Sequence, residues 1–145
     1  TGNKTELALG YCTLYGDMSG GLSVISDLSK SDVYSLSKWV NSINPDRIPI
    51  NSINKEPSAE LAPNQVDPFD YNIISPLVDA IIEDRKSMAE IIKEGVNINV
   101  LNSVYKKIRL NEYKRRQSAP GLRVSSKAFG VGRRMPIINY FQGEN

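Results

Sequence analysis

The spacing of apolar residues along the chain predicts helices joined by long polar loops. The first expected helix runs from about residue 4 to residue 15, where apolar side chains recur at i, i+4, i+7 and i+8 before a glycine. Those positions are Leu7, Tyr11, Leu14, Tyr15 and Gly16. Either Asn3 or Thr5 would cap the start of this helix, with Glu6 as the acidic residue of its first turn.

A second helix is expected after Ser29 or Ser31, either of which suits an N-cap. Its Trp39 is expected to pack rather than to serve function, beside an apolar face made of Val33, Leu36, Val40 and Ile43. The two helices are separated by a glycine-rich loop at 16–21 and an apolar piece at 22–25. That piece fits either an edge strand or a buried loop.

Helical periodicity is lost between Asn44 and Tyr71, and six of the eight prolines lie between residues 45 and 76. A loop this long inside a compact chain is typical of a lid or binding loop. We therefore expect 45–71 to close over a ligand. Three further helices are predicted at about Pro76–Asp84, at Ser87–Glu94 before Gly95, and at Ile98–Arg116 behind an Asn97 cap.

The 145 residues suffice for one domain with a core, and this chain reads as mostly α-helical with long loops. It lacks the β-branched runs that a parallel sheet of its own would need, which indicates a piece of a larger α/β domain. No apolar run approaches 18 residues, so neither a transmembrane helix nor a signal peptide is expected.

Two residue types restrict the chemistry. The single cysteine, Cys12, rules out an internal disulfide framework and fits a reducing compartment. The absence of histidine excludes a Ser-His-Asp triad, a Cys-His pair and a His-ligated zinc site within the chain. Carboxylates, lysines, arginines, hydroxyls, backbone amides and a hard metal remain.

Charge is divided unevenly along the chain. Residues 101–145 hold ten Lys or Arg residues and two acids, a net charge of +8, whereas residues 1–100 carry −6. A polyanionic partner of the basic end is therefore expected: a nucleotide, a nucleic acid or an acidic protein surface.

The first six residues combine the Thr1 hydroxyl, the Gly2 backbone without a side chain, and the Glu6 carboxylate about one helical turn later. Backbone N–H groups at a helix N-terminus attract anions, and Glu6 could hold Mg²⁺, which takes one or two carboxylates plus phosphate oxygens. The alternative is an ordinary capped helix start.

Several runs taken together resemble NAD⁺ synthetases, and more narrowly the C-terminal half of the synthetase domain in the glutamine-dependent form. The runs are those at 1–6, 10–17, 55–61 and 112–117, together with Lys30 and the tail at 128–137. They cover nearly the whole chain in the right order.

The resemblance implies an α/β parent fold, Rossmann-like, of the adenine nucleotide α-hydrolase or N-type ATP pyrophosphatase kind. It implies ATP and Mg²⁺ as cofactors, adenylation of deamido-NAD⁺, and displacement of AMP by ammonia released from glutamine. Residues 1–145 would then be the C-terminal part of the synthetase domain, inactive alone. The phosphate loop and the N-terminal glutaminase domain would belong to the rest of a cytoplasmic, homo-oligomeric enzyme without membrane contact.

Site residues follow from the same resemblance. Thr1, Lys30 and Ser58 match ATP-binding positions, and Glu6 matches the acid at the Mg²⁺ and nucleotide site. Glu6 and Lys114 match positions that face deamido-NAD⁺, and no residue of this chain is implied as a general base. Departures from the small ammonia-dependent enzymes fall at Leu14, Gly21 and Tyr113.

Two alternatives remain at this point. One is a different ATP-pyrophosphatase amidotransferase, although the run at 112–117 is not expected there. The other is a basic nucleic-acid-binding module. Nucleic acid is the weaker expectation, because Phe129, Tyr140 and Phe141 are too few and too clustered for a stacking platform.

Overall fold

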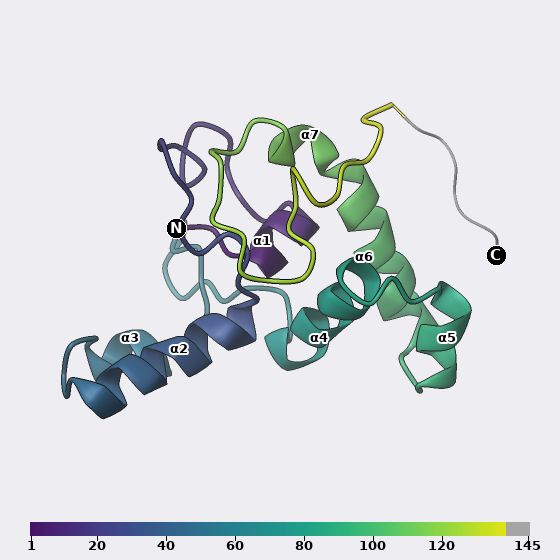
Figure 1. Cartoon of the computed structure of the whole chain (residues 1–145). Coiled ribbons are helices and arrows are strands. Elements are labelled where there is room, and N and C mark those ends of the chain that lie inside the picture. Colours follow the sequence, from purple (N-terminus) through teal and green to yellow (C-terminus); the bar gives the residue numbers. More distant parts are fainter. Residues whose placement is uncertain (139–145) are drawn as a thin grey trace.

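The computed structural model describes residues 1–138 of the chain, and within them all regular structure is helical (Figure 1). Two isolated β-bridges, Ser23 with Gly121 and Phe129 with Arg133, are the extended pairings of this part. The expectation of a mostly helical chain with long loops is confirmed for these residues. The helices are α1 (Lys4–Leu9), α2 (Lys30–Ile43), α3 (Ile50–Asn54), α4 (Tyr71–Ile82), α5 (Met88–Lys93), α6 (Ile98–Leu110) and α7 (Glu112–Arg115).

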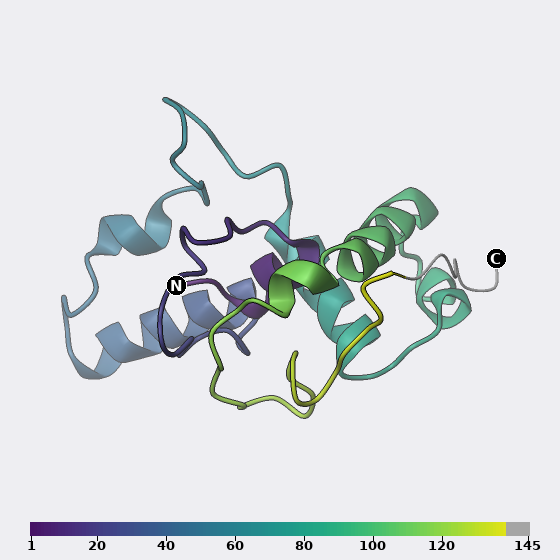
Figure 2. The same ribbon diagram turned by 90° about the horizontal axis from the view of Figure 1, so that it is seen from above.

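The hydrophobic core lies where α1, α4, α5 and α6 meet (Figure 2). Its fully buried centre consists of Ala8, Val78, Ile82, Ile91, Leu101 and Ile108. In Figure 1, α2 and α3 extend to one side of this core. Accordingly α2 buries none of its residues, and Trp39 is 57% exposed, so the expected packing role of Trp39 is wrong for the described residues.

Helix starts are where the polar pattern predicts them. Asn3 caps α1 through a reciprocal capping box with Glu6, and Ser29 caps α2 through the same arrangement with Asp32. Asn97 accepts from two backbone N–H groups at the start of α6. These caps resolve the alternatives in favour of Asn3 over Thr5 and of Ser29 over Ser31.

The first helix is shorter than predicted. It ends at Gly10, whose φ of +68° is left-handed, and a Cβ there would lie 2.0 Å from the Asn111 side chain. Leu14 and Tyr15 therefore lie outside the helix, and Tyr15 is 84% exposed. The apolar spacing beyond Leu9 does not continue the helix, because the backbone leaves the helical conformation at Gly10, where Asn111 occupies the space of a side chain.

Three more expectations about boundaries are wrong. The proline-rich segment contains α3, and α4 starts at Tyr71, five residues before Pro76. Pro76 sits on the exposed side of α4. The predicted helix at 98–116 breaks at Asn111 into α6 and α7. Of the two alternatives for 22–25, an edge strand or a buried loop, the structure has a loop with one bridge, and Leu22 and Val24 in it are more than half exposed. Among the described helices, none has the length and apolar character that crossing a membrane requires.

Candidate functional site

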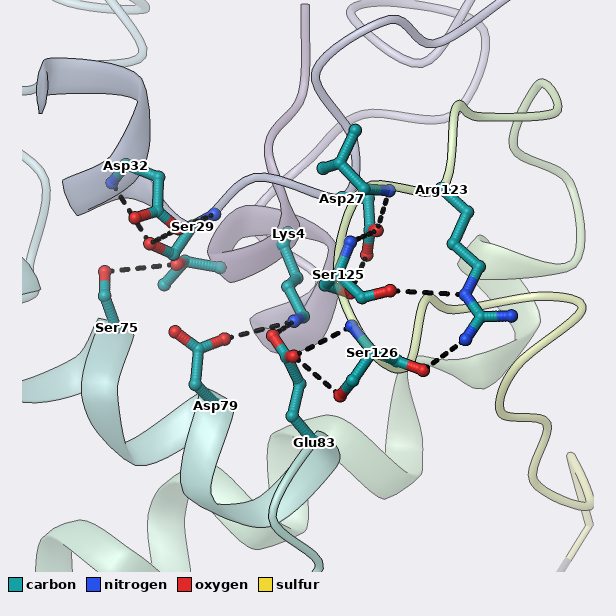
Figure 3. A network of polar contacts seen from close by, with 12 residues as sticks. Lys4, Asp27, Ser29, Asp32, Ser75, Asp79, Glu83, Arg123, Ser125 and Ser126 are labelled. Carbon is teal, nitrogen blue, oxygen red and sulfur yellow. Dashed lines mark hydrogen bonds and ion pairs between the residues drawn. The ribbon is translucent and has the colours of Figure 1, made fainter. Parts of the chain in front are cut away.

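The start of α1 is held by a layer of polar side chains around the buried Lys4 (Figure 3). The ammonium of Lys4, which is 1% exposed, pairs with Asp79 of α4 at 3.1 Å and with Glu83, which directly follows α4. One turn earlier on α4, Ser75 shares a 3.1 Å hydrogen bond with Thr5. Lys4 and Thr5, the first two residues of α1, are thus both held against α4.

Two acids of the same polar layer, Asp27 and Glu83, hold residues 124–126 of the basic tail through hydrogen bonds. Asp27 accepts hydrogen bonds from the Val124 and Ser125 N–H groups, both at 2.7 Å, and Glu83 accepts from Ser126 (Figure 3). Burial alone would raise the pKa of Glu83, but the bonds from Lys4 and Ser126 outweigh it and lower that pKa. Burial outweighs Lys4 at Asp79, whose pKa is raised.

Glu6 and Lys30, two of the predicted site residues, form an ion pair. The Lys30 Nζ lies 2.8 Å from Glu6 Oε1, and the side chains are 18% and 16% exposed. Glu6 Oε2 accepts from the Asn3 N–H at 3.1 Å, and the Lys30 N–H donates to Thr5 Oγ1 at 3.1 Å. A cation and an anion therefore face one another where the starts of α1 and α2 meet.

Tyr71, at the end of the proline-rich segment, lies beside the Glu6–Lys30 pair. The Lys30 Nζ lies 5.2 Å from the centre of the Tyr71 ring, within cation–π range. The Tyr71 hydroxyl donates to Asp67 at 2.8 Å. Burial first, and then Asp67, raises the pKa of Tyr71, so this phenol stays protonated at neutral pH.

Thr1 and Ser58 are not joined to the Glu6–Lys30 pair by any contact among residues 1–138. Thr1 is exposed. Ser58 accepts from the Glu60 N–H within its own turn, where Lys55 and Glu60 form an exposed ion pair. Their predicted ATP-binding roles remain predictions.

Lys114 lies at the opposite end of α1 from the Glu6–Lys30 pair. Its Nζ donates to the Gly10 and Cys12 carbonyls, both at 2.7 Å. Asn111 donates in the same way to the Leu9 carbonyl at 2.9 Å. The amine of Lys114 thus satisfies carbonyls at the end of α1, and the predicted contact with deamido-NAD⁺ remains a prediction.

Arg115 completes this cap from α7. Its buried guanidinium donates to the Leu7 and Ala8 carbonyls at 3.0 and 3.1 Å, to the Ile108 carbonyl, and to Glu112 at 3.1 Å. It also stacks over the Phe129 ring at 4.7 Å. Sequence reasoning missed Arg115 and Lys4 because charged residues are rarely buried, and neither position departs from an ordinary helix pattern.

Three other arginines of the basic end line a cavity of about 320 Å³ between α7 and the tail. Arg116, Arg123 and Arg134 line it, and each donates to a backbone carbonyl. Much of the +8 charge therefore holds chain segments together, which gives no support to a nucleic-acid module.

Metal and nucleophile chemistry are restricted in this part of the chain. Residues 1–138 contain no group of three or more His, Cys, Asp or Glu side chains that could hold a metal ion. Burial raises the pKa of Cys12 to about 11 despite the nearby Lys114, so its thiol is not an activated nucleophile.

The model of one protein family, NAD synthase, matches residues 1–118. The chain belongs to the NAD synthase family. It is 45% identical over 144 residues to a glutamine-dependent NAD⁺ synthetase of Synechocystis, a match that covers 97% of the chain and 26% of that relative. Its identity to a synthetase of the same name from Acinetobacter baylyi is 46% over 143 residues, covering 96% of the chain and 26% of the relative.

A crystal structure of a glutamine-dependent NAD⁺ synthetase from Cytophaga hutchinsonii superposes with a TM-score of 0.73 at 20% identity. That match covers 97% of the chain and 24% of the solved one, and it shows that the chain has the fold of the corresponding part. The chain spans about a quarter of the length of the curated relatives it matches.

Proposed function

We propose that this chain is part of a glutamine-dependent NAD⁺ synthetase, a ligase that amidates deamido-NAD⁺ at the expense of ATP. The nicotinate carboxylate attacks the α-phosphate of ATP and pyrophosphate leaves. Ammonia from glutamine then attacks the acyl adenylate, loses a proton and expels AMP. Support comes from family membership and from the identity to synthetases over nearly the whole chain.

The observation that carries the proposal is the Glu6–Lys30 pair at the starts of α1 and α2. Adenylation concentrates negative charge on the phosphates, and cations and backbone amides aimed there provide most of the catalysis. Lys30 would supply one such cation. Glu6 would hold Mg²⁺, which neutralises phosphate charge when bound.

The other predicted positions take their roles within the same proposal. Thr1 and Ser58 would contact ATP, and Glu6 and Lys114 would face deamido-NAD⁺. The phosphate loop and the glutaminase domain would lie elsewhere in a longer, cytoplasmic, homo-oligomeric protein of the Rossmann-like N-type ATP pyrophosphatase class. This chain would then provide one wall of the nucleotide site.

Product analysis on the full-length enzyme tests this function. With ATP, Mg²⁺, deamido-NAD⁺ and glutamine, we expect NAD⁺, AMP and pyrophosphate in equal amounts. Formation of ADP and phosphate, or NAD⁺ formation independent of ATP, would overturn the proposal.

Substitutions at the pair should lower turnover of ATP. Loss of one charge-assisted hydrogen bond costs about 1.5–3 kcal/mol, so Lys30→Met should reduce kcat/KM for ATP by about tenfold to a hundredfold. Lys86→Met is the matched control, since Lys86 pairs with Glu94 on the surface beyond α4. A loss of kcat/KM of the same size in both variants would contradict a contact between Lys30 and the nucleotide.

The proline-rich segment is expected to close over bound nucleotide. Its last part is already anchored, because Tyr71 bonds Asp67 and Phe69 packs on Tyr11, whereas residues 58–64 are largely exposed. Hydrogen exchange on the full-length enzyme should therefore slow at 55–64 when ATP and Mg²⁺ are added, with α5 unchanged. Equal exchange with and without ligand at 55–64 would contradict a lid.

A further inference from the structure

We propose that the Glu6–Lys30 ion pair makes metal ion and nucleotide bind as one unit, because each ligand must separate the pair. This inference rests on the proposed function and adds to it a coupling between the binding of the metal ion and that of the nucleotide. In the structure the two side chains neutralise each other at 2.8 Å, and each is less than one-fifth exposed. Water therefore screens the pair weakly, unlike an exposed ion pair.

Glu6 is the fixed member of the pair. Its Oε2 accepts from the Asn3 N–H at 3.1 Å, while its own N–H donates to Asn3 Oδ1 at 3.0 Å, closing the capping box. This reciprocal cap orients the carboxylate and leaves Oε1 aimed at Lys30. A metal ion that binds Glu6 must therefore displace the ammonium rather than draw the carboxylate to a new place.

Lys30 is the member that can move. Its backbone is fixed by the Ser29 cap and by the 3.1 Å bond from its N–H to Thr5, but its four-carbon stem carries the charge on rotatable bonds. The Tyr71 ring, 5.2 Å away, supports the ammonium from the side of the proline-rich segment. The amine can therefore leave Glu6 and still keep a neighbour that favours a cation.

The charges make the two binding events interdependent. A divalent cation alone would meet Lys30 at the carboxylate oxygen it needs, and like charges repel. A nucleotide without metal would draw Lys30 to its phosphates and leave Glu6 uncompensated beside them. When both bind, the metal takes Glu6 and the phosphates take Lys30, so every charge has a partner.

Metal binding without nucleotide tests this. In the full-length enzyme, Lys30→Met should tighten Mn²⁺ binding roughly tenfold, because the competing charged hydrogen bond is gone. The bound fraction is read by electron paramagnetic resonance. The same substitution should weaken binding of ATP with Mg²⁺, so one change would move the two affinities in opposite directions.

The reciprocal variant repeats the test from the other side. Glu6→Gln keeps an oxygen for the Asn3 cap but removes the negative charge. It should tighten the binding of ATP in the presence of EDTA and abolish the gain that Mg²⁺ normally gives. Isothermal calorimetry measures both, and this arm decides the question if Lys30→Met fails to fold. Lys86→Met, which leaves the pair intact, should behave as wild type in each titration.

The results separate this inference from the function on which it rests. Weaker binding of ATP with Mg²⁺ in Lys30→Met, with unchanged or weaker Mn²⁺ binding, would overturn the coupling and keep the nucleotide site. Unchanged affinity for ATP with Mg²⁺ in both Lys30→Met and Glu6→Gln would contradict the assignment of the nucleotide site to these two residues.

Discussion

Replacing Lys4 by methionine is expected to destabilise the enzyme by about 3–5 kcal/mol, the usual cost of removing one partner from a buried ion pair. Lys4 is 1% exposed and lies between Asp79 and Glu83. Methionine fills similar space, so the loss is mainly electrostatic: the carboxylates of Asp79 in α4 and of Glu83 directly after it would face one another without a cation. Urea unfolding of full-length protein, followed by a signal from this domain, measures the change.

The effect of Lys4→Met should shrink in acid. In the wild type the lowered pKa of Glu83 means that this carboxylate stabilises the fold above its ordinary titration range, and that stability is lost as the pH falls. Without Lys4 both carboxyl groups can avoid repulsion by taking up protons. The difference between variant and wild type should therefore be smaller near pH 5 than at pH 7. A deficit that is constant over this range would contradict an electrostatic origin.

Lys86→Met provides the comparison for this stability measurement as well. It removes a lysine from a lysine–glutamate pair, but in a surface pair whose partners are 34% and 51% exposed. No measurable loss of stability is expected there. Equal losses in the two variants would show that the buried position of Lys4 has no special importance.

Helix starts were predictable from the sequence because their signals are local. Asn3, Ser29 and Asn97 each cap the helix that follows, through bonds that span two or three residues. The end of α1 was not predictable. It depends on Asn111, which is far away in the chain and occupies the space that a side chain at Gly10 would need.

The candidate site shows the same division. Glu6 and Lys30 were selected by family resemblance, but their pairing requires α1 and α2 to meet, a tertiary fact that neither residue's neighbours encode. Lys114 was selected in the same way, and its bonds to the Gly10 and Cys12 carbonyls were not foreseen. A basic run predicts solvent exposure or an anion, whereas here its charges satisfy the end of a short helix.

Trp39 illustrates a different limit. The apolar spacing of α2 predicted a helix with one apolar face, yet within residues 1–138 Leu36, Trp39 and Ile43 are 43–57% exposed. Amphipathic spacing states that a helix has an apolar side, not which element covers it. The chain spans about a quarter of its relatives' length, and its own apolar spacing does not identify the element that would cover α2.

Arg115→Met is expected to cause a loss as large as that at Lys4, about 3–5 kcal/mol. The substitution would leave the Leu7, Ala8 and Ile108 carbonyls without the donors that now reach them, and would remove a cation from the 3% exposed Glu112. A buried acceptor without a partner costs about 1–3 kcal/mol by itself.

Two variants make the Arg115 result specific. Arg115→Lys keeps the charge but presents one ammonium in place of a planar fork, so it should restore only part of the stability. Arg47→Met alters an exposed arginine in the turn before α3 and should unfold like the wild type. Because the Leu7 and Ala8 carbonyls lie in the last turn of α1, Arg115→Met should also speed hydrogen exchange along α1 more than along α5. Wild-type stability in Arg115→Met, or full rescue by lysine, would show that the guanidinium geometry does not hold α1 in place.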